Sequence, residues 1–345
     1  MLNLIVMEYW GSSMIRRFSA MLLSIVAIIL LITACDRRVE VPKVGVIVPV
    51  SGDFASFGEQ VAKAVEDANH GRVQVIIEDE QCDSTKAANA YKKLTEIDAV
   101  KYIIGPGCGS PQEVVASFLA GSEDHLAIIP NAAAEGLYER SGGRLFQMQY
   151  SLEKETSFLA DAIYARGHHN ALLISYDNAF SKTHAQTFKQ VFKGRVLEDV
   201  VLGDRPEDVM LVMTKVRALQ PDVIYVTDLT FFIHNGLVKL HEQGIEVPVY
   251  ATYVAELPFV RTLVEGVIFS YPDDLDTTKD GVFSLGHQAA EILIDAIIQC
   301  EDKIDCVHDE LISSDAFDER GISTRGIGLY QIVGGDIVDL ATKNP

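Results

Sequence analysis

The segment Val44–Asn69, VGVIVPVSGDFASFGEQVAKAVEDAN, contains the change of pattern that decides the fold. It begins inside Lys43–Val50, a continuous apolar run of the kind found in strands that are buried on both faces. From Gly58 to Asn69 the apolar residues recur at helical spacing. A buried strand followed at once by an amphipathic helix opens a β-α-β unit, so we expect an α/β fold with a parallel sheet covered by helices.

The same alternation continues along the chain. Further buried strands are predicted at Val73–Glu78, Tyr102–Gly105, Leu126–Ile129, Ala171–Ser175, Val223–Val226, Val247–Ala251 and Gly266–Ser270. Helices are predicted at Ser84–Glu96, Pro111–Ala120, Glu153–Ala165, Ser181–Phe192, Glu207–Leu219 and Phe231–Gln243. So many units exceed one ordinary sheet, and we therefore expect two doubly wound parallel-sheet lobes.

The end of the chain departs from this alternation. After a long helix predicted at Val282–Gln299, two strand patterns at Gly326–Val333 and Ile337–Leu340 flank Gly334-Gly335. Two glycines between alternating apolar runs are typical of a two-residue β-hairpin. We therefore expect a terminal antiparallel pair of strands.

Composition limits the class of protein. The 345 residues are 48% hydrophobic and 23% charged, which is typical of a folded chain of about two domains. The formal net charge is −20, from 29 Lys and Arg against 49 Asp and Glu. Such an acidic surface repels phosphate backbones, so we expect no nucleic-acid partner.

The N-terminus predicts the location. Arg16-Arg17 precedes the apolar run Met21–Ile32, which is too short for a comfortable membrane span, and Thr33-Ala34-Cys35 follows it. We interpret residues 1–34 as a signal peptide, with Met14 as an alternative start to Met1. The stretch Ile32–Cys35 resembles a bacterial lipobox.

The lipobox resemblance implies that Cys35 is acylated and that residues 35–41 tether the protein to the lipid bilayer. We expect an extracytoplasmic protein, lipid-anchored on the periplasmic side of the bacterial cytoplasmic membrane. The alternative is an uncleaved anchor with Cys35 as an idle thiol. Asp36 resembles an inner-membrane retention signal.

Four cysteines remain besides Cys35, and an even number in an oxidising compartment predicts disulfides. Three pairings are possible, and sequence proximity favours Cys82–Cys108 and Cys300–Cys306. Zinc is the competing explanation, but structural zinc sites favour Cys pairs two to four residues apart, and neither spacing fits. We expect neither a metal nor a cofactor.

Several motifs occur in a characteristic order. The first loop places Pro49, Ser51, Gly52, Phe57 and Gly58 around the first helix start. Later landmarks are Glu78–Cys82 (EDEQC), Tyr102–Ser110 (YIIGPGCGS), Ile128–Ala134 (IIPNAAA), Pro221–Thr227 (PDVIYVT), Ala289–Ile297 (AAEILIDAI) and Phe317–Gly321 (FDERG). Together they resemble the type I periplasmic binding proteins, specifically the branched-chain amino-acid (leucine/isoleucine/valine) group, over the whole chain from Pro42.

This resemblance implies two lobes joined by a three-strand hinge. The N-lobe would combine residues 42–150 with 273–323, and the C-lobe 151–272 with 324–345. The crossings would lie near Met148–Leu152, Tyr271–Asp276 and Ile322–Gly326, and the ligand would be bound between the lobes and buried by closure. The resemblance also implies that the cysteine pair of the leucine/isoleucine/valine-binding type falls on Cys82 and Cys108.

The loop Gly105–Ser110 is the expected anion site. Pro111 is a favoured first helical residue, so free backbone N–H groups of the helix end would face the ligand. Gly107 and Gly109 would let the ligand approach the backbone, and Ser110 would offer a hydroxyl at the N-cap. In the amino-acid-binding relatives this loop receives the ligand carboxylate. The alternative is a tight turn in which Ser110 only caps the helix.

A second pocket loop departs from the relatives. Those specific for α-amino acids place a Thr where Ala133 stands, beside Asn131 and Ala132, and an acid where Tyr253 or Val254 stands. A buried ammonium needs an acceptor, so another carboxylate must replace them in an α-amino-acid site. The candidates at strand ends are Asp177, Asp228 and Glu256, and we favour Asp228. The alternative for each is a solvated loop residue or helix cap.

Aromatic residues on the same loops are expected to form apolar walls: Phe57, Phe180, Phe231 and Tyr253. Ordinary packing is the alternative for each one, and Phe54 could be an exposed loop residue. The complete expected set of ligand contacts is Ser51, Phe57, Gly107, Gly109, Ser110, Asn131, Ala132, Ala133, Asp177, Phe180, Asp228 and Tyr253.

Enzymatic motifs are missing from the sequence. It contains no G-x-S-x-G, G-x-x-x-x-G-K-[ST], H-E-x-x-H or H-R-D segment. We therefore expect no enzyme. The family resemblance and the lipobox together imply a substrate-binding lipoprotein of an ABC importer. It would be a monomer, bind a small carboxylate-bearing or amino-acid-like solute, and deliver it to a membrane permease. The alternatives are a ligand-sensing or regulatory envelope lipoprotein of the same fold, and a structural lipoprotein whose cleft is degenerate.

Overall fold

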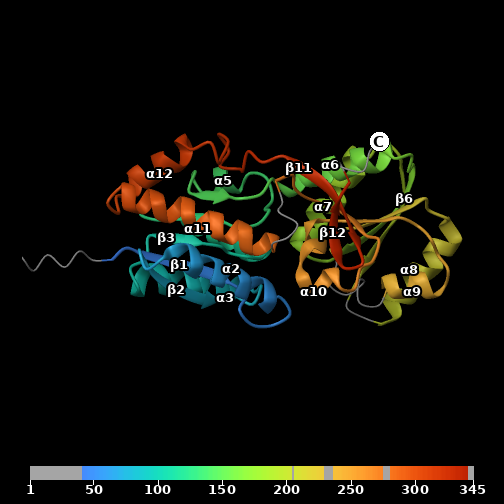
Figure 1. Ribbon diagram of the computed structural model, residues 1–345, viewed down its shortest axis with the longest axis horizontal. Coiled ribbons are helices and arrows are strands. Elements are labelled where there is room, and N and C mark those ends of the chain that lie inside the picture. The colour runs from blue at the N-terminus through green and yellow to red at the C-terminus, as the bar shows by residue number, and fades with distance from the viewer. Residues whose placement is uncertain (1–40, 204–205, 229–235, 275–279, 341–345) are drawn as a thin grey trace, which may run out of the picture. The chain divides into compact units, whose positions relative to one another are not determined.

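The computed structural model describes residues 41–203, 206–228, 236–274 and 280–340 (Figure 1). The predicted signal peptide, Cys35 and the tether up to residue 40 lie outside the described residues. The described chain forms two sheets, which belong to one compact unit that begins at Pro42.

The five-stranded sheet is entirely parallel, in the order β2-β1-β3-β4-β5. Its strands are β1 (Lys43–Val48), β2 (Gln74–Asp79), β3 (Tyr102–Ile104), β4 (Leu126–Ile129) and β5 (Leu145–Gln147). The connecting helices are α2 (Ala55–Asn69), α3 (Ser84–Lys92) with a π-helical turn at Lys93–Ile97, α4 (Gly109–Leu119) and α5 (Leu137–Arg140). The interior strand β1 is buried along almost its whole length, as its apolar run predicts.

The seven-stranded sheet has the order β12-β11-β10-β9-β8-β6-β7. Its parallel part consists of β6 (Asn170–Tyr176), β7 (Arg195–Leu202), β8 (Val223–Val226), β9 (Val249–Ala251) and β10 (Ile268–Pro272). The antiparallel hairpin of β11 (Ile327–Val333) and β12 (Asp336–Asp339) adds to β10. The other elements here are α6 (Leu152–Ala165), α7 (Ala179–Val191), α8 (Pro206–Leu219), α9 (Val238–Glu242), the 3₁₀ turn η3 (Tyr253–Glu256) and α10 (Pro258–Arg261).

The long helix α11 (Gly281–Gln299) returns the chain to the five-stranded sheet, and α12 (Ile304–Ser313) follows it. α11 packs along α2 and also contacts β3 and β4 (Figure 1). A Cβ atom built at Gly286 would lie 3.2 Å from the Ala64 Cβ, so the glycine permits this close approach. Among the described helices α11 alone is long and apolar enough to span a membrane, but these contacts make it a core helix.

The chain moves between the two sheets more than once, and residues 275–279 of one connection lie outside the described residues. It passes from β5 to α6, from β10 to α11, and from α12 to β11. Backbone hydrogen bonds join two of these stretches, because the Gln147 N–H donates to the Gly321 carbonyl and the Ser323 N–H to the Gln147 carbonyl, at 2.9 and 3.0 Å.

The predicted fold class is confirmed: the protein is α/β, with two parallel sheets and a terminal hairpin. The sequence patterns missed β5, α12 and β7, where Arg195–Leu202 is a half-exposed edge strand with charged residues in its middle. The helix predicted at Ser84–Glu96 changes to a π turn at Lys93. Of the helix predicted at Phe231–Gln243, α9 is described, while residues 231–235 lie outside the described residues.

Both predicted disulfides form. Cys82 pairs with Cys108 and Cys300 with Cys306, at Cα–Cα distances of 5.2 and 5.6 Å. The first closes a sequence separation of 26 residues and the second one of 6. Because a longer closed loop removes more chain entropy from the unfolded state, the first bond is expected to stabilise the fold more.

Replacing both cysteines of each pair by serine tests this difference. Loss of Cys82–Cys108 should lower the free energy of unfolding by roughly 3.5 kcal/mol, and loss of Cys300–Cys306 by roughly 2 kcal/mol. Urea unfolding of the two double variants under oxidising conditions gives both values. The reverse order of destabilisation would show that chain entropy does not dominate these bonds.

Candidate functional site

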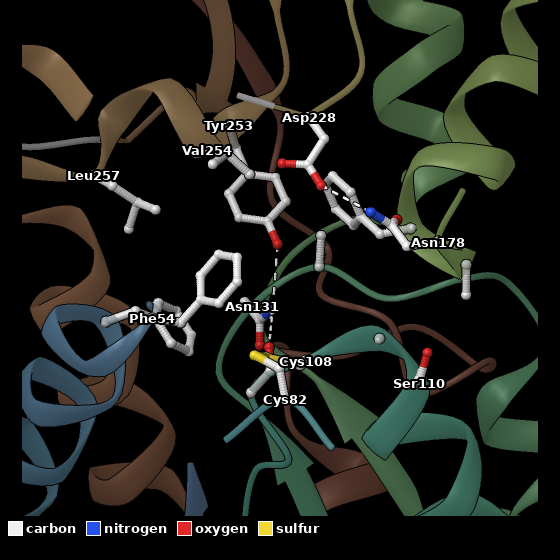
Figure 2. Close-up of a pocket in the computed structure, with 16 residues that line it drawn as sticks. Phe54, Cys82, Cys108, Ser110, Asn131, Asn178, Asp228, Tyr253, Val254 and Leu257 are labelled. Carbon is white, nitrogen blue, oxygen red and sulfur yellow. Dashed lines mark hydrogen bonds between the residues drawn. A yellow bond between two sulfur atoms is a disulfide. The ribbon is translucent and has the colours of Figure 1, made fainter. Parts of the chain in front are cut away.

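A cavity of about 230 Å³ lies where loops from both sheets meet (Figure 2). Each of these loops follows the carboxyl end of a strand, where open α/β sheets bind ligands. Its lining residues are Phe54, Phe57, Cys82, Gly107, Cys108, Gly109, Ser110, Asn131, Ala132, Asn178, Ala179, Phe180, Asp228, Tyr253, Val254 and Leu257.

The walls of the cavity are mainly apolar. Phe54 and Phe57 come from the start of α2, while Val254 and Leu257 follow β9. The rings of Phe180 and Tyr253 meet edge to face, with their centroids 5.8 Å apart. Aromatic rings offer large apolar contact area with little flexibility, so these walls suit a compact apolar group.

Asn131 joins the two sets of loops. Its Nδ2 donates to the Gly107 carbonyl at 3.0 Å and to the Tyr253 hydroxyl at 3.2 Å, as Figure 2 shows for the tyrosine. Tyr253 is buried, and burial raises the pKa of its phenol well above the ordinary value. The buried Oδ1 of Asn131 accepts no hydrogen bond from any described residue. A buried acceptor of this kind can receive a hydrogen bond from a ligand.

The polar end of the cavity contains Asp228 and Asn178. Asp228 follows β8 directly, and its Oδ2 accepts a hydrogen bond of 3.1 Å from Asn178 Nδ2. Asn178 also caps α7, because its Oδ1 accepts from the Ser181 N–H. Among the described lining residues Asp228 alone has an ordinarily charged side chain. This end of the cavity therefore favours hydrogen-bond donors.

The expected anion loop is partly occupied by the protein itself. Glu80 is fully buried, and its Oε1 accepts hydrogen bonds of 3.0 Å from both the Gly107 and Cys108 N–H groups. Burial raises the pKa of the Glu80 carboxyl to about 8, against the opposing effect of these bonds. Among the described residues, none accepts from the backbone N–H groups of Gly109 and Ser110. Of the backbone N–H groups from Gly107 to Ser110, a ligand anion would therefore meet those of Gly109 and Ser110.

The predicted start of α4 is also corrected by the structure. Cys108 is the N-cap residue and the helix begins at Gly109, so Pro111 is its third residue and Ser110 lies within the first turn. The predicted roles of Pro111 as the first helical residue and Ser110 as the cap are wrong. The reason is that Cys108, tied to Cys82 by the disulfide, is extended and already caps the helix.

Nine of the twelve predicted contact residues line the cavity, and three do not. The Ser51 hydroxyl donates to the Asp79 carboxylate at the end of β2. Ala133 is fully buried, and its carbonyl accepts from the Leu152 N–H at 3.0 Å. The side chain of Asp177 is 79% exposed and pairs with Lys182. Their local partners direct all three away from the ligand space.

The candidate carboxylate Glu256 lies elsewhere too. It is fully buried outside the cavity lining, and its Oε1 accepts from the Gly281 N–H at 2.9 Å, at the start of α11. Burial raises the pKa of Glu256 to about 8. Asp228, the preferred candidate, is thus the one of the three proposed carboxylates that lines the cavity.

Several lining residues were missed by the sequence interpretation. Phe54, for which an exposed loop position was one alternative, is half-buried at the cavity. Val254 and Leu257 belong to a 3₁₀ turn and its end, which have no helical or strand period. Asn178 had a usable signal, since an Asn between a strand end and a helix is a favoured cap.

The chain belongs to the periplasmic binding protein family, whose model matches residues 42–282. Members of this family are solute-binding proteins that act outside the cytoplasm, so the prediction of a binding protein and not an enzyme is confirmed. The predicted resemblance to the branched-chain amino-acid group is confirmed as well.

Individual relatives are distant. A Leu/Ile/Val-binding protein homolog from Brucella melitensis is 25% identical over 223 residues, which are 59% of this chain and 58% of the relative. The match thus spans little more than half the length of that curated relative. A leucine-binding protein from Thermotoga maritima has a TM-score of 0.77 at 18% identity and covers 87% of this chain and 97% of its own.

A solute-binding protein of an ABC transporter from R. palustris, solved in complex with benzoate, has a TM-score of 0.74 at 17% identity. The match covers 86% of this chain and 95% of that structure. At these identities the solved structures show the fold alone: they confirm the type I periplasmic binding architecture.

Replacing Glu80 tests its role in the loop. Glu80→Ala leaves two buried N–H groups without an acceptor and should lower the free energy of unfolding by roughly 2–4 kcal/mol. Glu80→Gln keeps an acceptor oxygen and should cost about 1 kcal/mol or less. Urea unfolding of both variants checks this, and equal losses would contradict the hydrogen-bonding role.

Proposed function

We propose that this protein is the extracytoplasmic substrate-binding lipoprotein of an ABC importer, and that it binds a small carboxylate-bearing or amino-acid-like solute between two lobes. The observation that carries the proposal is the cavity itself, which is lined by loops from the carboxyl ends of strands in both sheets. The family membership of the chain makes solute capture the expected use of such a cavity.

The size and walls of the cavity support a small ligand with an apolar body. Its volume of about 230 Å³ lies below the ~300–1,000 Å³ of sites for drug-sized ligands. The rings of Phe57, Phe180 and Tyr253 would cover the apolar part of the solute.

The polar groups support two recognition points. The N–H groups of Gly109 and Ser110 at the start of α4, which have no acceptor among the described residues, would receive a carboxylate. Asp228 and the Asn131 Oδ1 would accept from a donor group of the solute. Benzoate, bound by the R. palustris protein, and leucine, named for the Thermotoga maritima protein, both join a carboxylate to an apolar body.

Ligand binding would be coupled to hinge closure. The N-lobe is assigned residues 42–150 and 273–323, and the C-lobe residues 151–272 and 324–345. The hydrogen bond between Asn131 and Tyr253 then joins one lobe to the other, as a closed state requires. A ligand that contacts both sets of loops favours closure by its higher affinity for the closed state.

The N-terminal segment would attach the protein to the membrane. Acylation of Cys35 would hold the monomeric protein on the periplasmic side of the cytoplasmic membrane, where it delivers solute to a permease. The basic pair, apolar run and small residues before Cys35 support the anchor. The fold match to a solute-binding protein of an ABC transporter supports the importer.

Thermal unfolding in the presence of benzoates and of branched-chain and aromatic amino acids tests the ligand class. A true ligand at a hundred times its Kd adds about 2.7 kcal/mol to the stability, which raises the unfolding midpoint. Phe180→Ala should weaken binding roughly tenfold or more, since it removes one aromatic wall. Phe118→Ala is the matched control, because Phe118 stacks on Tyr91 outside the cavity. A panel without any stabilising compound would contradict the proposal.

Cys35→Ser tests the anchor. In a bacterial host that processes lipoproteins, the natural chain should incorporate labelled fatty acid and sediment with membranes, whereas the variant should do neither. Thr33→Ser, which keeps a small residue before the cleavage site, should behave like the natural chain. Membrane sedimentation of Cys35→Ser would argue for an uncleaved hydrophobic anchor.

A further inference from the structure

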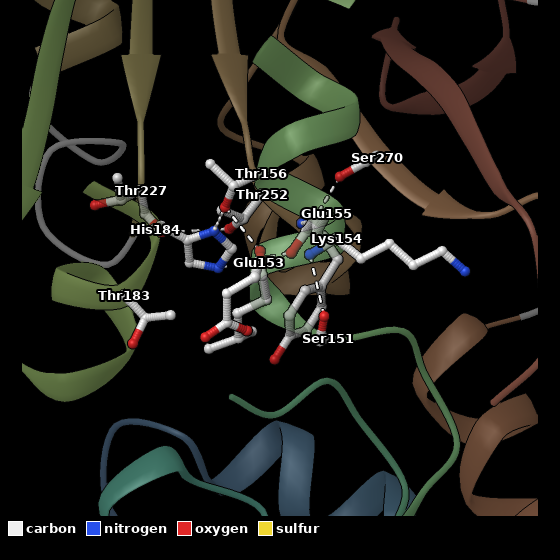
Figure 3. A network of polar contacts seen from close by, with 12 residues as sticks. Ser151, Glu153, Lys154, Glu155, Thr156, Thr183, His184, Thr227, Thr252 and Ser270 are labelled. Carbon is white, nitrogen blue, oxygen red and sulfur yellow. Dashed lines mark hydrogen bonds and ion pairs between the residues drawn. The ribbon is translucent and has the colours of Figure 1, made fainter. Parts of the chain in front are cut away.

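A fully buried polar network lies behind the cavity wall that Phe180 and Tyr253 form (Figure 3). Its centre is Glu155 of α6 and His184 of α7, and neither side chain is exposed. The His184 ring meets the Phe180 ring edge to face, with centroids 4.6 Å apart, and the Tyr253 N–H donates to Glu155 Oε1 at 2.8 Å. The two central residues therefore support two residues of the cavity lining.

The hydrogen bonds around His184 Nδ1 show that this nitrogen carries the ring proton. The Thr156 hydroxyl donates to the Leu152 carbonyl at 2.7 Å and lies 2.6 Å from His184 Nδ1. A hydroxyl has one hydrogen, so Thr156 must accept the second bond and Nδ1 must carry the N–H. The Tyr225 hydroxyl is more distant from the same nitrogen, at 3.3 Å.

The other side of His184 faces the carboxyl group. Glu155 Oε1 accepts from the Tyr253 N–H and from the Ser270 hydroxyl, the latter at 2.5 Å. Glu155 Oε2 lies 3.6 Å from His184 Nε2, and neither atom has a hydrogen-bond partner among the described residues. If neither atom carried a proton, two buried hydrogen-bond acceptors would face each other. Each unsatisfied acceptor would destabilise the fold by about 1–3 kcal/mol.

One proton resolves this conflict. It lets the two atoms close to the about 2.9 Å of a hydrogen bond, and the pair stays electrically neutral whichever atom carries the proton. Burial raises the pKa of Glu155 to about 8 and lowers that of His184 to about 3, so Glu155 holds the proton.

Among the described residues, no other group near the pair supplies a compensating charge. The titratable side chains that face it are the phenols of Tyr150 before α6, Tyr225 on β8 and Tyr253 on η3, and burial raises the pKa of all three. No lysine or arginine of the described chain forms an ion pair with Glu155 or His184. The proton on the pair is thus the local means of neutralising the carboxylate.

We propose that Glu155 and His184 are positioning residues for the ligand cavity: while they share one proton they hold Phe180 and Tyr253 in place, and loss of that proton weakens ligand binding. This inference rests on the proposed function, because the cavity is the same. The fold places the pair on two different helices, α6 and α7, so its separation sets how Phe180 at the start of α7 lies against Tyr253.

The sign of the pH effect follows from the raised pKa of Glu155. Below about pH 8 the folded protein keeps the proton, and the cavity wall is intact. Above that pH an unpaired buried carboxylate faces the bare Nε2, and the fraction of binding-competent protein falls. The ligand affinity should then decrease by up to about tenfold for each further pH unit.

Glu155→Gln separates the proton from the shape of the side chain. The amide oxygen still accepts from Tyr253 and Ser270, and the amide N–H₂ donates to His184 Nε2 without a titrating proton. Asp161→Asn is the matched control, since Asp161 is on the same helix but exposed and paired with Lys193.

Calorimetric titration with the tightest ligand of the panel, between about pH 6 and about pH 9.5, measures the effect. The natural chain and Asp161→Asn should lose affinity above about pH 8, and Glu155→Gln should lose clearly less, because only the titration of Glu80 at the cavity loop remains in that variant. An equal loss in Glu155→Gln overturns the inference. A tenfold or larger loss of affinity in Glu155→Gln at neutral pH also overturns it. The amide of that variant donates a hydrogen bond as a protonated Glu155 would, so such a loss would mean that a donor at this position does not suffice to hold the cavity wall.

Ligand-free measurements keep this inference distinguishable from the proposed function. The infrared difference spectrum between the natural chain and Glu155→Gln should show, near neutral pH, a protonated-carboxyl band that belongs to Glu155, because the bands of the buried Glu80 and Glu256 are common to both chains and cancel. The NMR ring resonances of Phe180 and Tyr253 should shift as that band disappears on raising the pH, and stay constant in Glu155→Gln. If no panel compound binds but these shifts occur, the ligand class fails and the positioning pair stands. If the band or the shifts are missing, Glu155 and His184 are not positioning residues of this kind, whether or not a panel compound binds.

Discussion

The parallel direction of the strands is the constraint on which the site depends. Because parallel strands all end at the same edge of a sheet, the loops after β1, β2, β3 and β4 converge at one edge, and those after β6, β8 and β9 converge at another. Every described lining residue belongs to one of these loops or to the first turn of the helix that follows. The two edges are in direct contact, because Asn131 after β4 donates a hydrogen bond to Tyr253 after β9.

Much of the polar capacity around the cavity is used by the protein. Glu80 takes two of the N–H groups at the start of α4, Asn178 holds Asp228, and the Asn131 amide N–H₂ is shared between Gly107 and Tyr253. The solute is left with few recognition points among apolar walls. Such a cavity selects mainly by excluding unsuitable ligands. A ligand that places a polar group against the rings loses the hydration of that group and gains no hydrogen bond in return.

The parts of the fold that the sequence predicted are those set by local periodicity. The apolar run of β1, the helical spacing of α2 and the Gly334-Gly335 turn each specify their own structure. The contacts that the sequence did not predict join residues that are far apart in the chain. Glu155 meets Ser270 across 115 residues, and Glu80 meets Gly107 across 27, so neither contact leaves a periodic signal. Pro111 misled the placement of the helix start, because Cys108 caps α4 two residues earlier than a proline at the first position implies.

The Cys82–Cys108 bond belongs to the cavity lining and not only to the scaffold. Thiols remain reduced in the cytoplasm and are oxidised after export. A newly synthesised chain therefore lacks a finished recognition surface until it has left the compartment of its synthesis. Because members of this family act outside the cytoplasm, the last covalent bond of the cavity lining is made in the compartment where the protein works.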